Sequence, residues 1–141
     1  MARFHAILLA FPLLGSAPPT ASLNLGISGL RNANGLVQAC LTRDPAHFPS
    51  CEKDPEAVTR SISAKSATLD VVGLAPGTYA VALFHDENAN RKLDKFMGVP
   101  REGFGFSRNP VIRFGPPRFN QAEIRLDPGL TRQSVRMQYI L

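Results

Sequence analysis

The sequence is short of charged residues, and that shortage excludes some classes of protein. Only 19% of its 141 residues are Asp, Glu, Lys or Arg, below the ~25% of an average soluble domain. A coiled coil or a long charged helix is therefore excluded. The 11 glycines and 12 prolines favour a turn-rich β protein over a helical bundle. The length suits a single domain.

Long apolar runs are also lacking, except for one at the N-terminus. Residues 6–14 form this run, which follows the positive charge of Arg3 and precedes the small residues 15–17. This order is typical of a secretory signal. The run is shorter than the ~20 residues of a membrane span, although a membrane anchor or a buried first strand are the alternatives. We expect residues 1–21 to be a signal peptide, with cleavage after Ala17 or Ala21. Residues 22–141 would then be one domain, periplasmic or secreted and without a transmembrane segment.

Cysteine is scarce, since Cys40 and Cys51 are the only two. In an oxidising compartment such a pair is most simply one disulfide. Closing so short a loop would stabilise the fold by roughly 2–3 kcal/mol. The alternative is a redox or metal pair. The spacing is not C-x-x-C and only His47 lies nearby, so that alternative is weakly supported.

Short alternating apolar runs between Gly, Pro, Asn and Asp clusters predict an all-β fold. Residues 78–85 carry apolar side chains on both faces, which indicates a central strand. Residues 54–60 have room for one helical turn. About seven strands favour an antiparallel sandwich, immunoglobulin-like or transthyretin-like. The expected strands span residues 23–27, 36–41, 69–72, 78–85, 111–114, 122–126 and 134–140.

One loop carries the residue types of a calcium site. Side-chain oxygens occupy positions 1, 3, 5 and 9 of a calcium-loop pattern, and Lys92 would offer its backbone carbonyl at position 7. The four side chains are those of Asp86, Asn88, Asn90 and Asp94.

The loop also departs from that pattern. Arg91 replaces the glycine of position 6, and Met97 replaces the bidentate Glu of position 12. Glu102 could supply the missing carboxylate if the chain folds back. The alternative is a turn in which Asp and Asn side chains bind backbone amides without any metal. We therefore expect either a structural Ca²⁺ ion or an empty turn.

The segments around this loop resemble a known family. Residues 77–88, the segment Lys92-Leu93-Asp94, the run Gly103-Phe104-Gly105-Phe106-Ser107 and residues 114–119 are together similar to the bacterial exported family called "domain of unknown function 2141". The family usually has glycine where this chain has Arg91. The resemblance covers most of the chain after the predicted signal. It implies a small exported β-sandwich and no particular reaction.

Charge is unevenly distributed, which indicates either an ordinary solvated basic face or a ligand-binding surface. Residues 22–90 hold five Lys/Arg and seven Asp/Glu, a net charge of −2. Residues 91–141 hold ten Lys/Arg and four Asp/Glu, a net charge of +6. A basic face could attract an anionic glycan, lipid headgroups or another envelope component. Export makes nucleic acid an unexpected partner. The candidate ligand-binding residues are His85, Phe104, Phe106 and Arg118.

Catalytic motifs are lacking. The sequence has no nucleophile elbow and no zinc-protease helix. His85, Asp86 and Glu102 form the only cluster of candidate acid–base groups. We therefore predict that the protein is not an enzyme. The sequence favours an exported cell-envelope β-sandwich, structural or binding, with a calcium-binding-like loop. The alternatives are a small-molecule or glycan-binding module and a hydrolase centred on His85.

Overall fold

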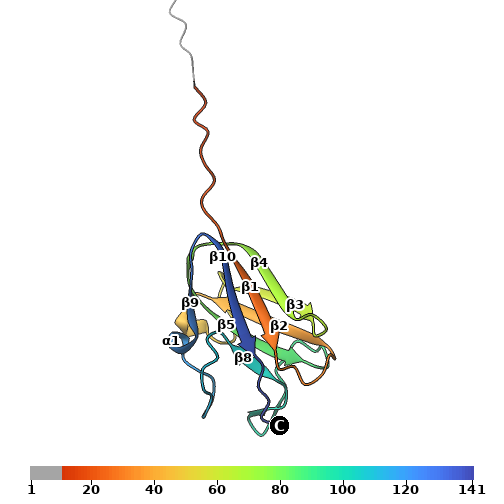
Figure 1. Cartoon of the computed structure of the whole chain (residues 1–141). Coiled ribbons are helices and arrows are strands. Elements are labelled where there is room, and N and C mark those ends of the chain that lie inside the picture. Colours follow the sequence, from red (N-terminus) through yellow and green to blue (C-terminus); the bar gives the residue numbers. More distant parts are fainter. Residues whose placement is uncertain (1–10) are drawn as a thin grey trace, which may run out of the picture.

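The computed structural model describes residues 11–141 and confirms the all-β sandwich (Figure 1). One sheet has the strand order β10-β1-β4. It consists of β1 (Ala21–Ser28), β4 (Thr68–Leu74) and β10 (Gly129–Arg136). β4 pairs with β1 in antiparallel fashion, whereas β10 pairs with it in parallel, from Ala21↔Gly129 to Ser28↔Arg136. Among the strand pairs of residues 11–141, this parallel pair alone departs from the antiparallel sandwich expected from the sequence.

The second sheet is built around β5, the strand that the sequence indicated as central. β5 pairs with β2 along one edge and with β8 and β9 along the other. β3 completes the sheet at its outer edge by pairing with β2. The strands are β2 (Leu36–Thr42), β3 (Val58–Ser63), β5 (Gly77–Asp86), β8 (Phe104–Phe106) and β9 (Glu123–Leu126).

Four short elements lie in the connections. They are the 3-10 turn η1 (Pro45–His47), the helix α1 (Phe119–Ala122) and the two-stranded hairpin of β6 (Lys95–Phe96) and β7 (Val99–Pro100). Within residues 11–141, no helix has the length and apolar character to cross a membrane.

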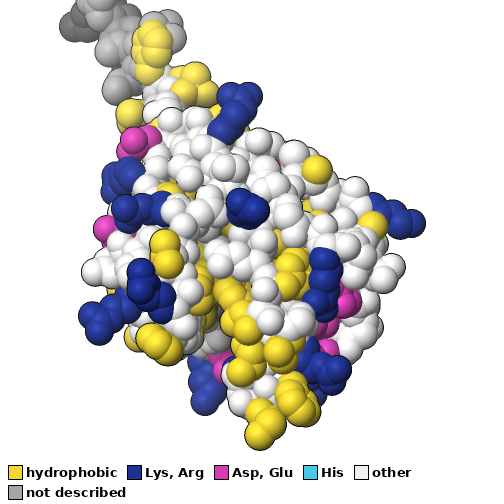
Figure 2. All heavy atoms as spheres, turned by 60° about the horizontal axis from the view of Figure 1, so that its bottom comes forward, with side chains coloured by type: hydrophobic (Ala, Val, Ile, Leu, Met, Phe, Trp, Pro, Cys, Tyr) yellow, Lys and Arg dark blue, Asp and Glu magenta, His cyan; other side chains and the backbone are white. Residues whose placement is uncertain are grey.

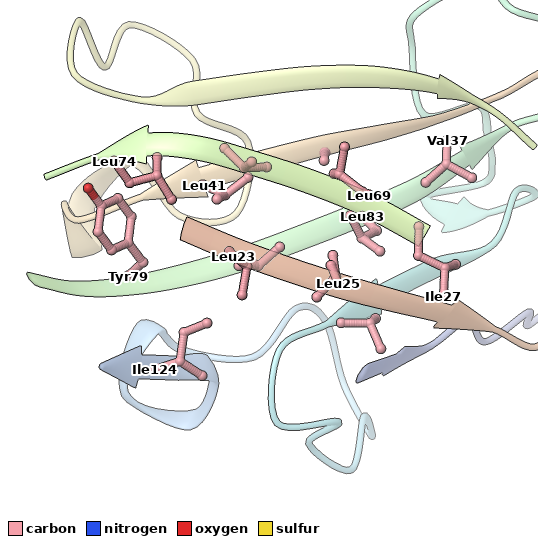
Figure 3. Packing of buried hydrophobic residues seen from close by; sticks show 14 of the residues in the cluster. Leu23, Leu25, Ile27, Val37, Leu41, Leu69, Leu74, Tyr79, Leu83 and Ile124 are labelled. Carbon is pink, nitrogen blue, oxygen red and sulfur yellow. The ribbon is translucent and has the colours of Figure 1, made fainter. Parts of the chain in front are cut away.

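The main hydrophobic core fills the space between the two sheets (Figure 3). Alternate residues of β1 point into it, with Leu23, Leu25 and Ile27 buried, as period-2 patterning requires. From the opposite sheet, β5 contributes Tyr79 and Leu83. Each such aliphatic side chain contributes about 1.5–3 kcal/mol on burial. This core is what fixes the two sheets, and therefore the loops at their ends, relative to each other.

A second, smaller cluster covers the outer face of the β5 sheet. Phe104 and Phe106 of β8 pack there with Phe48. The expected disulfide, Cys40–Cys51, lies in the same cluster with its Cα atoms 5.8 Å apart. The apolar residues on both faces of β5 therefore serve two cores, as the sequence indicated.

Two expected elements are wrong, and a third is displaced, since the strand expected at residues 134–140 is β10, which runs from Gly129 to Arg136. Residues 111–114 are irregular, and Val111 and Phe114 are exposed, because prolines at 110, 116 and 117 flank a run that meets no neighbouring strand. Residues 54–60 contain a turn followed by the start of β3 instead of a helical turn. β3 is an edge strand with mostly exposed residues, so it lacks the apolar alternation by which a strand is recognised.

The N-terminal signal prediction lies partly outside the described residues, since residues 1–10 are not described. Residues 11–20 are exposed and have no regular structure. The sandwich begins at Ala21, which is fully buried and pairs with Leu74 and Gly129. The first strand of the sandwich therefore includes Ala21, and the boundary between signal and domain stays a prediction.

Candidate functional site

Asp86 ends β5 and anchors the loop that follows. Its side chain is fully buried. Its Oδ1 accepts a hydrogen bond from the backbone N–H of Asn90 at 3.0 Å, and its Oδ2 accepts from the N–H of Arg91 at 2.8 Å. Oδ2 also accepts from the Gln38 side chain of β2 at 3.0 Å. A single carboxylate thus ties the loop to the central strands.

The two asparagines of the loop make successive Asx turns. The Oδ1 of Asn88 accepts from the N–H of Asn90 at 3.2 Å, and the Oδ1 of Asn90 accepts from the N–H of Lys92 at 2.9 Å. Both side-chain amides donate to the Asp94 carboxylate, at 2.7 Å from Asn88 and at 3.0 and 3.1 Å from Asn90. The hydrogen bonds from Asn90 and then Asn88 lower the pKa of Asp94.

Glu102 folds back onto the loop. It is buried, and its two oxygens accept from the backbone N–H groups of Glu87 and Asp94, each at 3.1 Å. Burial raises the pKa of Glu102, and the negative charges of Asp94 and Asp86 raise it further. The structure therefore concentrates three carboxylates, those of Asp86, Asp94 and Glu102, around one short loop.

The backbone of the loop turns sharply at two residues other than glycine. Ala89 has φ 55° and Arg91 has φ 63°, in the left-handed region that favours glycine. In the calcium-loop pattern the turn at position 6 is made by glycine. Arg91 stands at that position and adopts a left-handed conformation there. The substitution noted in the sequence has therefore not removed the turn.

A polar hollow of about 630 Å³ opens beside this loop. Basic and acidic side chains line it together, and they include Arg31, Lys95, Arg101, Glu87, Asp94 and Glu102. Among residues 11–141, no three His, Cys, Asp or Glu side chains converge in a metal-binding arrangement. The oxygens of the loop are instead engaged by backbone and side-chain amides.

Arg31 links three segments that border the hollow, and no sequence pattern indicated this role. Its Nε donates to Glu87 Oε1 at 2.5 Å, and this bond is the main cause of the lowered pKa of Glu87. Its other nitrogens donate to the carbonyls of Leu141 at 2.6 Å and Arg101 at 3.0 Å. The guanidinium also lies 4.6 Å from the ring centre of Tyr139. No spacing rule links residue 31 to partners 56 to 110 residues away.

His85 lies beneath this region and is fully buried. Its Nε2 is 2.7 Å from the carbonyl oxygen of Asn34, and its Nδ1 is 2.7 Å from the hydroxyl of Tyr139. Because a carbonyl only accepts, Nε2 carries the hydrogen. Burial raises the pKa of Tyr139, which keeps its hydroxyl protonated. Both ring nitrogens of His85 are therefore engaged within the protein.

Residues 25–134 match a family described as an uncharacterized protein conserved in bacteria, DUF2141. The chain belongs to the DUF2141 family. This confirms the resemblance seen in the sequence. No curated protein and no solved structure matches the chain.

The Gly103-to-Ser107 run of this DUF2141 chain has a packing role in the structure. A Cβ at Gly105 would lie 2.6 Å from Val135, and one at Gly103 would collide with the Tyr139 ring. The glycines thus let β8 pack closely on the C-terminal segment. Phe104 and Phe106 point the other way, into the second cluster.

The other ligand-binding candidates expected from the sequence are not part of the lining of the polar hollow of the DUF2141 domain. Phe104 and Phe106 are buried, so they form no exposed ligand-binding surface. Arg118 is exposed and immediately precedes α1. His85 is enclosed as described above. None of these four side chains lines the hollow, whereas Asn88, Asp94 and Glu102 from the calcium-loop set do.

Proposed function

We propose that the protein is an exported, non-catalytic module of the cell envelope whose loop at residues 86–94 takes up a Ca²⁺ ion together with Glu102. The observation that carries the proposal is the gathering of Asp86, Asp94 and Glu102 around one loop. Burial is the main cause of the raised pKa of Glu102, and the charges of Asp94 and Asp86 raise it further. A divalent cation would relieve that repulsion.

The donor chemistry fits a hard cation. Ca²⁺ prefers carboxylate, amide and backbone carbonyl oxygens, and the loop offers Asp86, Asn88, Asn90 and Asp94 with the Lys92 carbonyl. The side-chain amides of Asn88 and Asn90 now hold the Asp94 carboxylate. Binding would replace these hydrogen bonds, which places the expected affinity in the weak range of extracellular calcium modules, about 10⁻⁴–10⁻³ M.

Thermal unfolding in EGTA and in millimolar Ca²⁺ tests this proposal. At a Ca²⁺ concentration ten times the dissociation constant, binding adds about 1.4 kcal/mol to the free energy of unfolding. For a domain of this size the melting temperature would rise by about 5 °C. An Asp94→Asn variant should respond less, and an Asp127→Asn variant, changed on the exposed surface, should respond like the wild type. An unchanged melting temperature of the wild-type protein would reject the calcium proposal.

Export is supported by two features of the described chain. Residues 11–20 are exposed, so their removal would leave both hydrophobic clusters intact. Ala21 is fully buried in β1, which favours cleavage after Ala17 over cleavage after Ala21. The Cys40–Cys51 disulfide suits an oxidising compartment. A periplasmic or secreted location follows from the proposal, and N-terminal sequencing of the exported protein would test it.

A non-catalytic role is supported by the surroundings of His85. A general base must reach the proton that it removes, and His85 is fully buried with both ring nitrogens engaged. We therefore do not favour the hydrolase alternative.

A second candidate function is favoured by the polar hollow itself. Its lining includes the carboxylates of Glu87, Asp94 and Glu102. It also includes Arg31, Lys95 and Arg101, whose cations suit an anionic small molecule or glycan. An NMR titration with an anionic oligosaccharide should then shift the amide signals of these residues and leave those of β3 unchanged. The absence of any shift at the hollow would reject this candidate.

A further inference from the structure

The hairpin of β6 and β7 presents large apolar side chains to solvent. Met97 is 88% exposed and Phe96 is 57% exposed. Met97 and Gly98 form the two-residue turn, with φ 50° and 81°. Two such positive angles are typical of a turn that favours Asn-Gly, so an exposed methionine there is not explained by turn preference. Scattered exposed apolar residues are ordinary, but two neighbouring ones at a projecting tip indicate a contact surface.

Cations lie on the hairpin and in the segments that flank it in the sequence. Arg91, Lys92, Lys95 and Arg101 are exposed, and within residues 11–141 none of them lies within ion-pair distance of a carboxylate. Arg101 lies 6.0 Å from the ring centre of Phe96. Four carboxylates lie near these cations. Those of Asp86 and Glu102 are buried and bind backbone amides. That of Asp94 accepts hydrogen bonds from the side chains of Asn88 and Asn90, and that of Glu87 pairs with Arg31. The tip is therefore apolar at its end and basic around its base.

The C-terminus extends the same surface. Ile140 and Leu141 are about half exposed, and Arg31 joins the Leu141 carbonyl to that of Arg101, which follows the hairpin. Figure 2 shows hydrophobic side chains gathered at this end of the molecule, with Lys and Arg side chains and some Asp and Glu side chains beside them. The N-terminal segment leaves the sandwich at the opposite end (Figure 1).

We propose that the β6–β7 hairpin inserts Phe96 and Met97 into the interfacial layer of a bilayer that carries anionic phospholipids. Apolar side chains enter the boundary between headgroups and acyl chains, and the surrounding Lys and Arg side chains bind the phosphates. This charge complementarity favours a lipid surface over an apolar protein partner. The inference goes beyond the proposed function and needs no bound Ca²⁺.

A single tryptophan tests the insertion. The protein contains no Trp, so Met97→Trp gives a fluorophore only at the hairpin tip. In EGTA, its emission should move to shorter wavelength on addition of vesicles of phosphatidylcholine and phosphatidylglycerol, and brominated acyl chains should quench it. Vesicles of phosphatidylcholine alone should give a much smaller change, because the cations then have no counterpart.

Val72→Trp provides the control. Val72 is 72% exposed on β4, towards the end of the sandwich where the N-terminal segment enters. Its emission should not change. If the emission of Val72→Trp alone shifts, the vesicles bind at the end of the molecule from which residues 1–20 extend. If the emission of both variants shifts, the association is general. Either result shows that the hairpin proposal is wrong. Unchanged emission of Met97→Trp in the presence of anionic vesicles would also overturn the proposal, and a protein partner for the hairpin tip would then be the remaining explanation.

Two further variants separate binding from folding. Met97→Asn suits the turn better, so it should keep or raise the melting temperature while vesicle binding falls. Lys95→Gln should weaken binding to anionic vesicles about fivefold, the equivalent of about 1 kcal/mol per basic residue at such a surface. Lys53→Gln, in the exposed loop that follows the other end of β2, should not. Unchanged vesicle binding of both Met97→Asn and Lys95→Gln would contradict the proposal.

Discussion

The loop depends on the buried carboxylate of Asp86, and the substitution Asp86→Asn tests how strongly. In the wild-type protein, Oδ1 accepts from the N–H of Asn90 and Oδ2 accepts from the N–H of Arg91. An asparagine has one oxygen and one NH₂ group at these places. Whichever way its amide turns, the NH₂ group faces a backbone N–H. The substitution thus keeps the shape of the side chain and removes an acceptor.

The expected loss follows from these contacts. A buried donor left without its acceptor costs about 1–3 kcal/mol. Asn90 and Arg91 are exposed, so water can reach their amides after a small movement of the loop. Gln38 can also turn its amide to accept from the new NH₂ group. We therefore expect Asp86→Asn to lower the free energy of unfolding by about 2 kcal/mol.

Chemical denaturation in EGTA, where no cation contributes, measures this loss. Asp127→Asn is the matched control, because Asp127 is exposed and only pairs with Arg125 at the surface; its cost should stay below about 0.5 kcal/mol. If Asp86→Asn costs no more than the control, the carboxylate is not the anchor of the loop, and our account of the loop is wrong.

Three other predictions concern packing, the disulfide and pH. Gly105→Ala should destabilise the protein by about 1–3 kcal/mol, because its Cβ would lie 2.6 Å from Val135. Gly26→Ala is the control, since a Cβ there has no contact under 3.8 Å, and it should show no such loss. Equal denaturation midpoints of the two variants would refute the close packing at Gly105. Replacing both cysteines by alanine should lower the free energy of unfolding by about 3 kcal/mol in the chain-entropy model, and reduction of the wild-type protein should reproduce this loss in a thermal melt. Arg31 lowers the pKa of Glu87, so this pair stabilises the fold above the ordinary pKa of Glu and the contribution disappears as pH falls through the lowered value. The stability difference between wild type and Arg31→Gln should therefore be about 1 kcal/mol larger at pH 7 than at pH 3, and a difference independent of pH would show that the ion pair contributes nothing.

Strands whose apolar residues alternate could be predicted from the sequence. A strand with few buried residues could not, and one apolar run without a partner strand was wrongly predicted to be a strand. β1 and β5 follow the period-2 pattern, and both were expected. β3 is an exposed edge strand with a polar sequence, so nothing distinguished it from a loop. Residues 111–114 have β-forming side chains but no strand beside them, and pairing over long distances in the sequence cannot be read from local composition.

The candidate site was predictable only in its local part. The oxygen-bearing side chains from Asp86 to Asp94 are close in the sequence, and their spacing indicated one loop. Glu102 folds back onto this loop, and its role as a calcium ligand stays a prediction. Arg31 and Tyr139 reach the same place from the two ends of the chain, and only the pairing of the sheets brings them there. The exposed hairpin tip likewise became visible only with the backbone angles of Met97 and Gly98.

The most direct test of the central claim is a calorimetric titration of the protein with Ca²⁺. Our account predicts one ion per chain, with a dissociation constant of about 10⁻⁴–10⁻³ M and weaker binding by Asp94→Asn. The Asp127→Asn variant should bind like the wild type. A titration that shows no binding of Ca²⁺, or equal binding by all three proteins, would contradict the claim that the loop at residues 86–94 is a calcium site.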